Sequence, residues 1–371
     1  MFTTQGLFAK GDGGGRRTLL RNSSFLRSRR TQGLKGRGGH REGERVRGPM
    51  GLRTLSTKAG RQTTLGDRAT VAGIGVHTGL PVTLTLHPAE AGTGVTFVRC
   101  GVDGRPELEI HANARSVSAT ELATVLGDGT GPGISTIEHI MATLCGLGVD
   151  NAIVELDGPE APIMDGSAAR FVEAVDRAGI VRLAARRRFT KVLKPVRVIK
   201  DEALGELRPY EHGFRVDVEI DFDHPLIGRQ EFGLDVEPAS FRREIARART
   251  FGFMRDVGRL WSSGYALGAS LENTLVLSED RVVNPEGLRF ADEFVRHKVL
   301  DAVGDLSLAG APILGAYRSV RGGHQLNHAV LCALIADPTA WTVVEAPAPR
   351  VRAHADVAAG LVAPAYGAEV S

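Results

Sequence analysis

The segment FVRHKVLDAVGDL, residues 294–306, holds three side chains that could bind a metal or move a proton. On a helix, His297 and Asp301 are four residues apart and share one face, and Asp305 follows one turn later. Apolar residues such as Val299 lie on the opposite face, which is expected to meet the core. An imidazole nitrogen and a carboxylate oxygen one turn apart can bind one divalent metal, with Asp305 behind them as an orienting group. The alternative is a solvated face, whose His–Asp pair contributes only a few tenths of a kcal/mol.

A second helix is predicted over residues 136–146, and it carries His139 opposite its own apolar stripe. If the two halves of the chain face each other, the polar faces of both helices meet. His139, His297 and Asp301 then form a set of two histidines and one aspartate. This is the ligand count of a catalytic zinc site whose fourth position is open to water.

Two further residues could take part in proton transfer. Glu138 directly precedes His139 and could serve as the base for a metal-activated water, but Ser135-x-x-Glu138 equally fits a capping box at a helix start. His324 lies in GGHQLNH, residues 322–328, where flanking glycines allow close approach to a substrate. A histidine on such a loop could donate to a leaving group, or simply be exposed.

The surrounding pattern alternates strands and helices in two halves. In the first half we expect strands in 83–89, 94–100 and 151–156, a turn at GIGVHTG (73–79), and helices over 136–146 and 167–178. After a charged break at 184–195, the second half has predicted strands at 196–200, 214–222 and 313–320 and helices near 238–248, over 294–306 and from about Asn327. Each half has an H-x6-G helix followed by a hydrophobic strand, so the sequence predicts two similar α+β units packed face to face.

Length and composition agree with a globular protein of two domains. The chain has 371 residues, of which 42% are hydrophobic, enough to bury sizeable cores. No run of 18 uncharged apolar residues and no secretory signal occurs in the sequence, so we expect no membrane span. The three cysteines are odd in number and form no CxxC pattern, which favours a reducing, cytoplasmic location.

The charge is divided unevenly along the chain. Residues 1–60 hold 14 Lys and Arg against three acidic residues, whereas 61–371 hold 32 basic and 40 acidic residues, a net charge of −8. The basic tail lacks apolar periodicity and is predicted to be disordered. It could be a nucleic-acid or anionic-lipid arm, an organellar transit peptide, or sequence upstream of a true start at Met50. A non-catalytic nucleic-acid module is the rival function, and the acidic remainder of the chain argues against it.

Seven segments, in order, resemble motifs of the UDP-3-O-acyl-N-acetylglucosamine deacetylases, zinc amidases that commit the bacterial pathway to lipid A. They are GIGVHTG (73–79), ISTIEHI (134–140), APIMDGSA (161–168), IDFDHP (220–225), RARTFGFMRD (247–256), GLRFADEFVRHKVLDAVGDL (287–306) and GGHQLN (322–327). The resemblance runs from about Gln62 to Ala340. It implies an α+β fold of two similar two-layer α/β sandwich domains with small inserts. The corresponding ranges are a tail at 1–60, domains at 61–187 and 188–345, and an extension at 346–371.

The resemblance also implies roles for the residues above. The two histidines and the aspartate of the predicted set would bind zinc, with ferrous iron as the alternative metal. Glu138 would be the general base, and His324 would be the general acid or electrostatic partner, oriented by Asp305. The implied reaction hydrolyses the 2-acetamido group of a UDP-linked, 3-O-acylated glucosamine and releases acetate.

Substrate contacts follow from the same resemblance. Thr250 would hydrogen-bond the oxyanion, and Lys298 would reach the diphosphate or the reacting centre. Asp221 and Phe222 fall at nucleoside-contact positions, and residues 264–272 lie where the family builds a hydrophobic passage for the acyl chain.

The sequence departs from the family pattern at two places. GGHQLNH stands where relatives often have SGHALNN, and Glu121 occupies a position that is often apolar. Both departures affect the expected acyl-chain details rather than the reaction. The expected partner is the UDP-linked acylated amino sugar alone, bound by a monomer that makes no nucleic-acid contact and at most a peripheral membrane contact.

Overall fold

The computed structural model describes residues 60–101, 106–131 and 133–347. The predicted basic tail, apart from Gly60, and the extension beyond residue 347 lie outside the described residues, as do the predictions made for them. Within the described part, no helix has the length and apolar character needed to cross a membrane.

The first half is built on a five-stranded sheet of order β2-β3-β8-β4-β5. Alternation explains its strands: in β3, Val82, Leu84 and Leu86 point into the core and the residues between them do not. Two short pairs, β1-β9 and β6-β7, form separate two-stranded sheets. The elements are β1 (Arg61–Leu65), β2 (Ala69–Ile74), β3 (Pro81–Pro88), β4 (Val95–Cys100), β5 (Pro106–His111), β6 (Val117–Ala119), β7 (Val125–Leu126), α1 (Glu138–Leu147), β8 (Ala152–Leu156), α2 (Ala169–Ala178) and β9 (Ile180–Arg186).

The second half is built on a seven-stranded sheet whose central strand, β17, pairs with β12, β10 and β13. β17 is buried along most of its length, as its run ILGAYRSV predicts for a central strand. The elements are β10 (Arg188–Val192), β11 (Val196–Lys200), β12 (Ala203–Arg208), β13 (Phe214–Phe222), β14 (Gly228–Asp235), α3 (Pro238–Ser240), β15 (Phe251–Phe253), α4 (Val257–Ser262), β16 (Leu275–Leu277), α5 (Glu293–Leu306), β17 (Ile313–Val320), α6 (His324–Ala336) and β18 (Trp341–Glu345).

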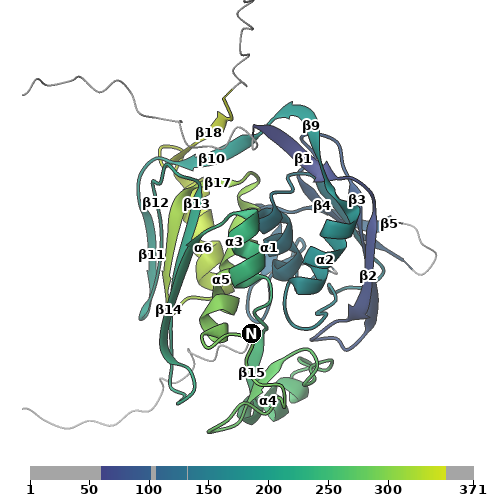
Figure 1. Ribbon diagram of the computed structural model, residues 1–371, viewed down its shortest axis with the longest axis vertical. Coiled ribbons are helices and arrows are strands. Elements are labelled where there is room, and N and C mark those ends of the chain that lie inside the picture. The colour runs from purple at the N-terminus through teal and green to yellow at the C-terminus, as the bar shows by residue number, and fades with distance from the viewer. Residues whose placement is uncertain (1–59, 102–105, 132, 348–371) are drawn as a thin grey trace, which may run out of the picture.

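The long helices lie between the two sheets. Figure 1 shows α1, α2, α5 and α6 in the middle of the molecule, with β11, β12 and β14 on one side and β2, β3 and β5 on the other. Helices α1 and α5 cross in close contact because Gly304 has no side chain: a Cβ there would lie 2.1 Å from the carbonyl oxygen of Glu138. The predicted α+β fold, with two halves packed face to face, is confirmed.

One insert extends away from both sheets, in the lower part of Figure 1. It contains the parallel pair β15-β16 and helix α4. Several of its large apolar side chains are exposed, with Trp261 at 56% and Leu267 at 54%. Residues 264–272, for which an acyl passage was implied, belong to this insert.

Two helix predictions were wrong in detail. The helix expected near 238–248 is only the short α3, followed by a wider helical turn over Phe241–Ile245. The last helix begins at His324 rather than near Asn327. Local periodicity locates helices well, but where they begin and end depends on capping and tertiary contacts.

Candidate active site

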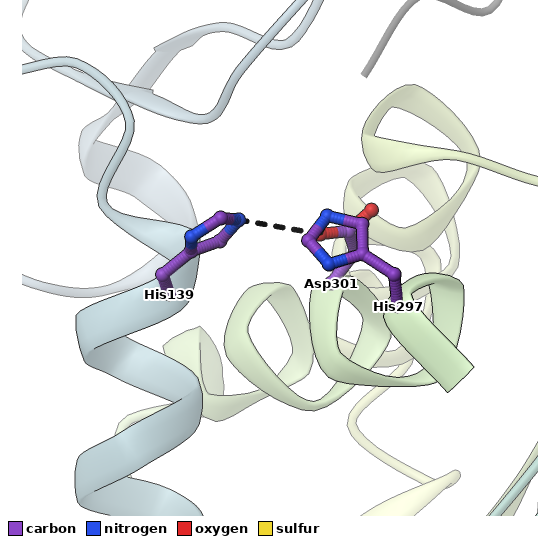
Figure 2. Close-up of side chains that lie close together, drawn as sticks. All are labelled: His139, His297 and Asp301. Carbon is purple, nitrogen blue, oxygen red and sulfur yellow. Dashed lines mark ion pairs between the residues drawn. The ribbon is translucent and has the colours of Figure 1, made fainter. Parts of the chain in front are cut away.

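The predicted ligand set comes together between α1 and α5. Figure 2 shows His139 on the first turn of α1 pointing toward His297 and Asp301 on α5. One possible ligand atom of each residue lies within 4.8 Å of the others. Asp301 Oδ1 is 3.3 Å from Nε2 of His297 and 3.9 Å from Nε2 of His139.

The polar face of α5 is not solvated, so that interpretation is wrong. Every residue of α5 except Arg296 is buried. The reason is its position: one side packs on β13 and β14, and the other sides meet α1 and α6. A helix wheel alone could not reveal the second layer that covers the polar face.

The unpaired atoms of the cluster fit a bound cation. Nδ1 of His297 donates to the carbonyl oxygen of Ala248 at 3.0 Å, which leaves Nε2 as an acceptor. This Nε2 and Oδ1 of Asp301 are buried and have no hydrogen-bond partner in the part of the chain that the structure describes. A buried unpaired acceptor costs about 1–3 kcal/mol, and one divalent metal would satisfy both atoms.

The protonation states also suit a metal. Burial lowers the pKa of His139 to about 4 and that of His297 to about 3, so both rings are neutral near pH 7. Burial alone would raise the pKa of Asp301, but the electrostatic interactions with the nearby His297 and Lys298 side chains outweigh it and lower that pKa. Neutral imidazole and ionised carboxylate are the forms that bind a metal.

Glu138 is not a capping residue. Helix α1 has Ile137 as its N-cap, without a side-chain cap, and Ser135 Oγ donates weakly to the carbonyl of Pro159 at 3.4 Å. The Glu138 side chain instead turns inward, where Oε2 accepts the backbone N–H of Thr124 at 3.0 Å. The capping-box alternative is therefore wrong, and the carboxylate is free for another task.

The inward carboxylate of Glu138 has the properties of a proton acceptor near neutral pH. The residue is 1% exposed, and burial raises its pKa to about 7, with His324 opposing the rise and Asp305 adding to it. Oε1 is buried and has no hydrogen-bond partner among the described residues. Glu138 therefore has one oxygen, Oε2, fixed by a hydrogen bond, and one unpaired oxygen, Oε1, that can accept a proton beside His139.

His324 is buried at the start of α6, not on an exposed loop as one alternative expected. Its Nδ1 lies 2.7 Å from Oδ2 of Asp305, and its Nε2 lies 4.0 Å from Oδ2 of Asp301. Burial opposes protonation, but the charge and hydrogen bond of Asp305 outweigh it and raise the pKa of His324. Asp305 thus bonds His324, rather than either metal-ligand candidate on its own helix.

Thr250 lines a small cavity together with His139 of the cluster. The cavity is about 10 Å³, close to the space for one water, and its lining includes Glu138, His139, Thr250 and His77. Thr250 is fixed in place because its N–H donates to the carbonyl of Gly166 at 2.8 Å.

The predicted substrate-contact residues lie on α5, between His297 and Asp301, and at the end of β13. Lys298 Nζ donates to Asp301 Oδ2 at 3.1 Å and lies 5.9 Å from the ring centre of Phe251. Phe222 packs edge-on against the same ring, with centroids 5.7 Å apart. Asp221 is ion-paired with Arg321. The Phe251 ring thus connects Lys298 to the end of β13.

Comparison with known proteins decides the family. A family model described as UDP-3-O-acyl N-acetylglycosamine deacetylase matches residues 62–336. This chain belongs to that deacetylase family. Curated UDP-3-O-acyl-N-acetylglucosamine deacetylases of Brucella ovis, Brucella abortus (strain S19) and Brucella melitensis biotype 2 are each 52% identical over 287 residues, covering 77% of this chain and 99% of the relative. The family resemblance found in the sequence is confirmed, and all seven motifs lie inside the matched range.

Three residues of this deacetylase site were missed in the sequence. Thr124 touches Glu138 and Asp305, Asn327 donates to Asp305 at 2.8 Å, and His77 lines the small cavity. His77 and Asn327 stand inside quoted motifs, GIGVHTG and GGHQLN, which could have drawn attention to them. Thr124 has no local signal, because its partners are distant in sequence.

A larger cavity lies elsewhere in the deacetylase, near the C-terminal ends of α1 and α5. It has a volume of about 510 Å³ and is lined by residues that include Cys145, Leu306 and Trp341. None of the three metal-ligand candidates lines it. The smaller cavity is the candidate active site, because Glu138 and His139 line it and a site is recognised by its chemical groups rather than by its volume.

Proposed function

We propose that this chain hydrolyses the N-acetyl group of UDP-3-O-acyl-N-acetylglucosamine, giving the free amine and acetate, the committed step of lipid A biosynthesis. Family membership supports the reaction, and the names of the relatives supply the substrate. The observation that carries the proposal is the buried cluster in which His297 and Asp301 keep unpaired acceptors beside the open oxygen of Glu138.

The metal proposed for this cluster is zinc, with ferrous iron as the alternative. His139, His297 and Asp301 would hold it, because two neutral imidazoles and a carboxylate are a frequent donor set for catalytic zinc. When bound, it would lower the pKa of a water and polarise the amide carbonyl.

Glu138 is proposed as the general base. Its open Oε1 would take a proton from the attacking water, while the N–H of Thr124 keeps Oε2 in place. A pKa of about 7 suits this task, because a base whose pKa is near the operating pH both accepts and releases a proton readily.

His324 is proposed as the general acid. Asp305 accepts the hydrogen on Nδ1, so Nε2 can carry the proton toward the metal cluster. That proton would go to the leaving nitrogen as the C–N bond breaks. Water thus supplies one hydrogen to Glu138 and the oxygen to acetate, and the sugar keeps its nitrogen as an amine.

The remaining roles concern the substrate. We propose that Thr250 hydrogen-bonds the oxyanion and that Lys298 meets the reacting centre or the diphosphate. Asp221 and Phe222 would contact the nucleoside. Residues 264–272 would guide the acyl chain, and the exposed apolar side chains of the insert support this role. The N–H of Leu267 donates to the carbonyl of His77, which places this segment beside the cavity.

Cellular context and domain division complete the proposal. We propose a cytoplasmic monomer with domains at 61–187 and 188–345, the junction lying between β9 and β10. Cys145 and Cys332 are free, which agrees with a reducing compartment.

The reaction can be tested with purified protein and the UDP-linked substrate. Released acetate should appear in equal amount to the free amine, disappear after the metal is removed, and return when zinc is added. The 3-O-acylated sugar without UDP is the matched control and should react more slowly. A metal-loaded, folded protein that releases no acetate would contradict the proposal.

A further inference from the structure

Thr124 connects the proposed base to the proposed acid. Its backbone N–H donates to Oε2 of Glu138 at 3.0 Å, and its hydroxyl donates to Oδ1 of Asp305 at 2.6 Å. Thr124 is only 2% exposed. Glu138 is on α1 and Asp305 is on α5, so one residue binds a carboxylate on each of the two helices that carry the metal-ligand candidates.

The two oxygens of Asp305 are held in different ways. His324 Nδ1 and Asn327 Nδ2 both meet Oδ2, at 2.7 and 2.8 Å, whereas the Thr124 hydroxyl meets Oδ1. The hydroxyl of Tyr317 donates to Oδ1 of Asn327 at 2.7 Å, which orients the Asn327 amide so that its NH2 faces Asp305. The carboxylate plane of Asp305 is therefore fixed from both ends.

The backbone of Thr124 is anchored independently of its hydroxyl. Its carbonyl accepts the N–H of Ile137, at the start of α1, at a long 3.4 Å, and its own N–H is held by Glu138. Replacing the hydroxyl with a methyl group therefore removes the bond to Asp305 and leaves the bond to Glu138 in place. Valine has nearly the shape of threonine, so the change is chemical rather than steric.

We propose that Thr124 is a positioning residue for the deacetylation: it holds the Glu138 carboxylate and the Asp305–His324 pair at a fixed separation across the two helices. The proposal rests on the roles given above to Glu138 and His324. Both groups must face one substrate carbon and nitrogen, and displacements of about 1 Å can reduce turnover by about 10²-fold. Thr124 acts through Asp305, so its loss lowers kcat and leaves KM nearly unchanged.

The test compares zinc-loaded Thr124→Val and Thr124→Ser proteins in kcat and KM for the UDP-linked substrate. Thr124→Val should lower kcat about 10–100-fold, the range typical when a supporting hydrogen bond of a metal site is removed. KM and zinc content should stay near wild type, and the melting temperature should fall by only a few degrees, because the buried Oδ1 of Asp305 loses its donor. Thr124→Ser keeps the hydroxyl and should recover most of kcat. Thr96→Val is the matched control, because it removes another buried hydroxyl, bonded to His111 at 2.8 Å, outside the site.

A double-mutant cycle separates positioning from general stabilisation. In an Asp305→Ala background, Thr124→Val should cost less than about threefold, because the closest partner of the hydroxyl is gone and only its longer, 3.3 Å contact with Nδ1 of His324 remains. The proposal is overturned if Thr124→Val keeps wild-type kcat, if Thr124→Ser is equally slow, or if the two single effects multiply. A metal-loaded wild-type protein that releases no acetate would instead contradict the proposed function, whatever the metal content and stability of the Thr124 variants.

Discussion

Two of the buried carboxylates on helix α5, those of Glu293 and Asp301, lie about two turns apart, and their surroundings differ. Glu293, 0% exposed, accepts hydrogen bonds from the N–H and guanidinium of Arg249 at 2.9–3.2 Å and from the N–H of Arg289 at 2.6 Å. Asp301 is equally buried, yet its Oδ1 has no hydrogen-bond partner among the described residues. The protein supplies hydrogen-bond donors to the Glu293 carboxylate, whereas Oδ1 of Asp301 is left to bind a ligand such as a metal ion.

This difference separates structural from reactive polar groups. A buried polar network in which every group is hydrogen-bonded stabilises and orients its surroundings. A buried network with unpaired groups lowers stability, and such groups are found mainly at functional sites. The two also cooperate, because Arg249 directly precedes Thr250. The Glu293 network therefore fixes β15 against α5, and with it the threonine that faces the Glu138 cavity.

The largest effect on activity is expected at the reactive cluster. His297→Ala removes a metal-ligand candidate and should reduce both metal content and turnover to the level of the metal-free protein. Metal analysis and acetate release, measured on the same sample, check this. Retention of one tightly bound zinc with normal turnover would remove His297 from the ligand set.

Glu138→Gln should separate metal binding from chemistry. The amide has nearly the same shape but cannot accept the proton, so turnover should fall by at least about 10²-fold, the lower range for a general base. Metal content should stay at the wild-type value. If the rate is intact, the base is another group.

Glu293→Ala is expected to act on stability instead. It leaves the Arg249 guanidinium without its main buried partner, so the free energy of unfolding should fall by about 3–5 kcal/mol. Urea unfolding measures this, and Arg170→Ala, at an exposed ion pair on α2, is a control expected to change it by less than about 1 kcal/mol. A small loss of stability would mean that Glu293 is not a structural centre.

The smallest effect is a pH dependence of the metal-free protein. The folded-state pKa of Glu138 is about 7 against its usual 4.5. Between pH 4.5 and 7 the folded chain therefore keeps a proton on Glu138 that the unfolded chain has released. Stability from this group is present below 4.5 and lost as pH rises through 7. Relative to wild type, Glu138→Gln should therefore gain stability from pH 4.5 to 8 in urea unfolding. A constant difference would show that Glu138 has an ordinary pKa.

The sequence was informative where the signal was local. The strands β11, β13 and β17 coincide with the predicted 196–200, 214–222 and 313–320, because alternation and apolar runs are short-range patterns. Helical spacing also put His297 and Asp301 on one face. The family resemblance then supplied the reaction.

Long-range contacts could not be predicted in the same way. Whether the polar face of α5 met water or α1 depended on packing between helices more than 140 residues apart in the chain. The same holds for Thr124, whose hydroxyl bonds a residue 181 positions away. Glu138 fitted a capping box equally well until the bond from the Thr124 N–H was known.

Anomalous diffraction at the zinc absorption edge, from crystals of the zinc-loaded protein, tests the central claim most directly. We expect one strong peak at bonding distance, about 2.0–2.2 Å, from a nitrogen of His139, a nitrogen of His297 and a carboxylate oxygen of Asp301. A zinc-loaded crystal whose peak lies away from these three residues would contradict the account.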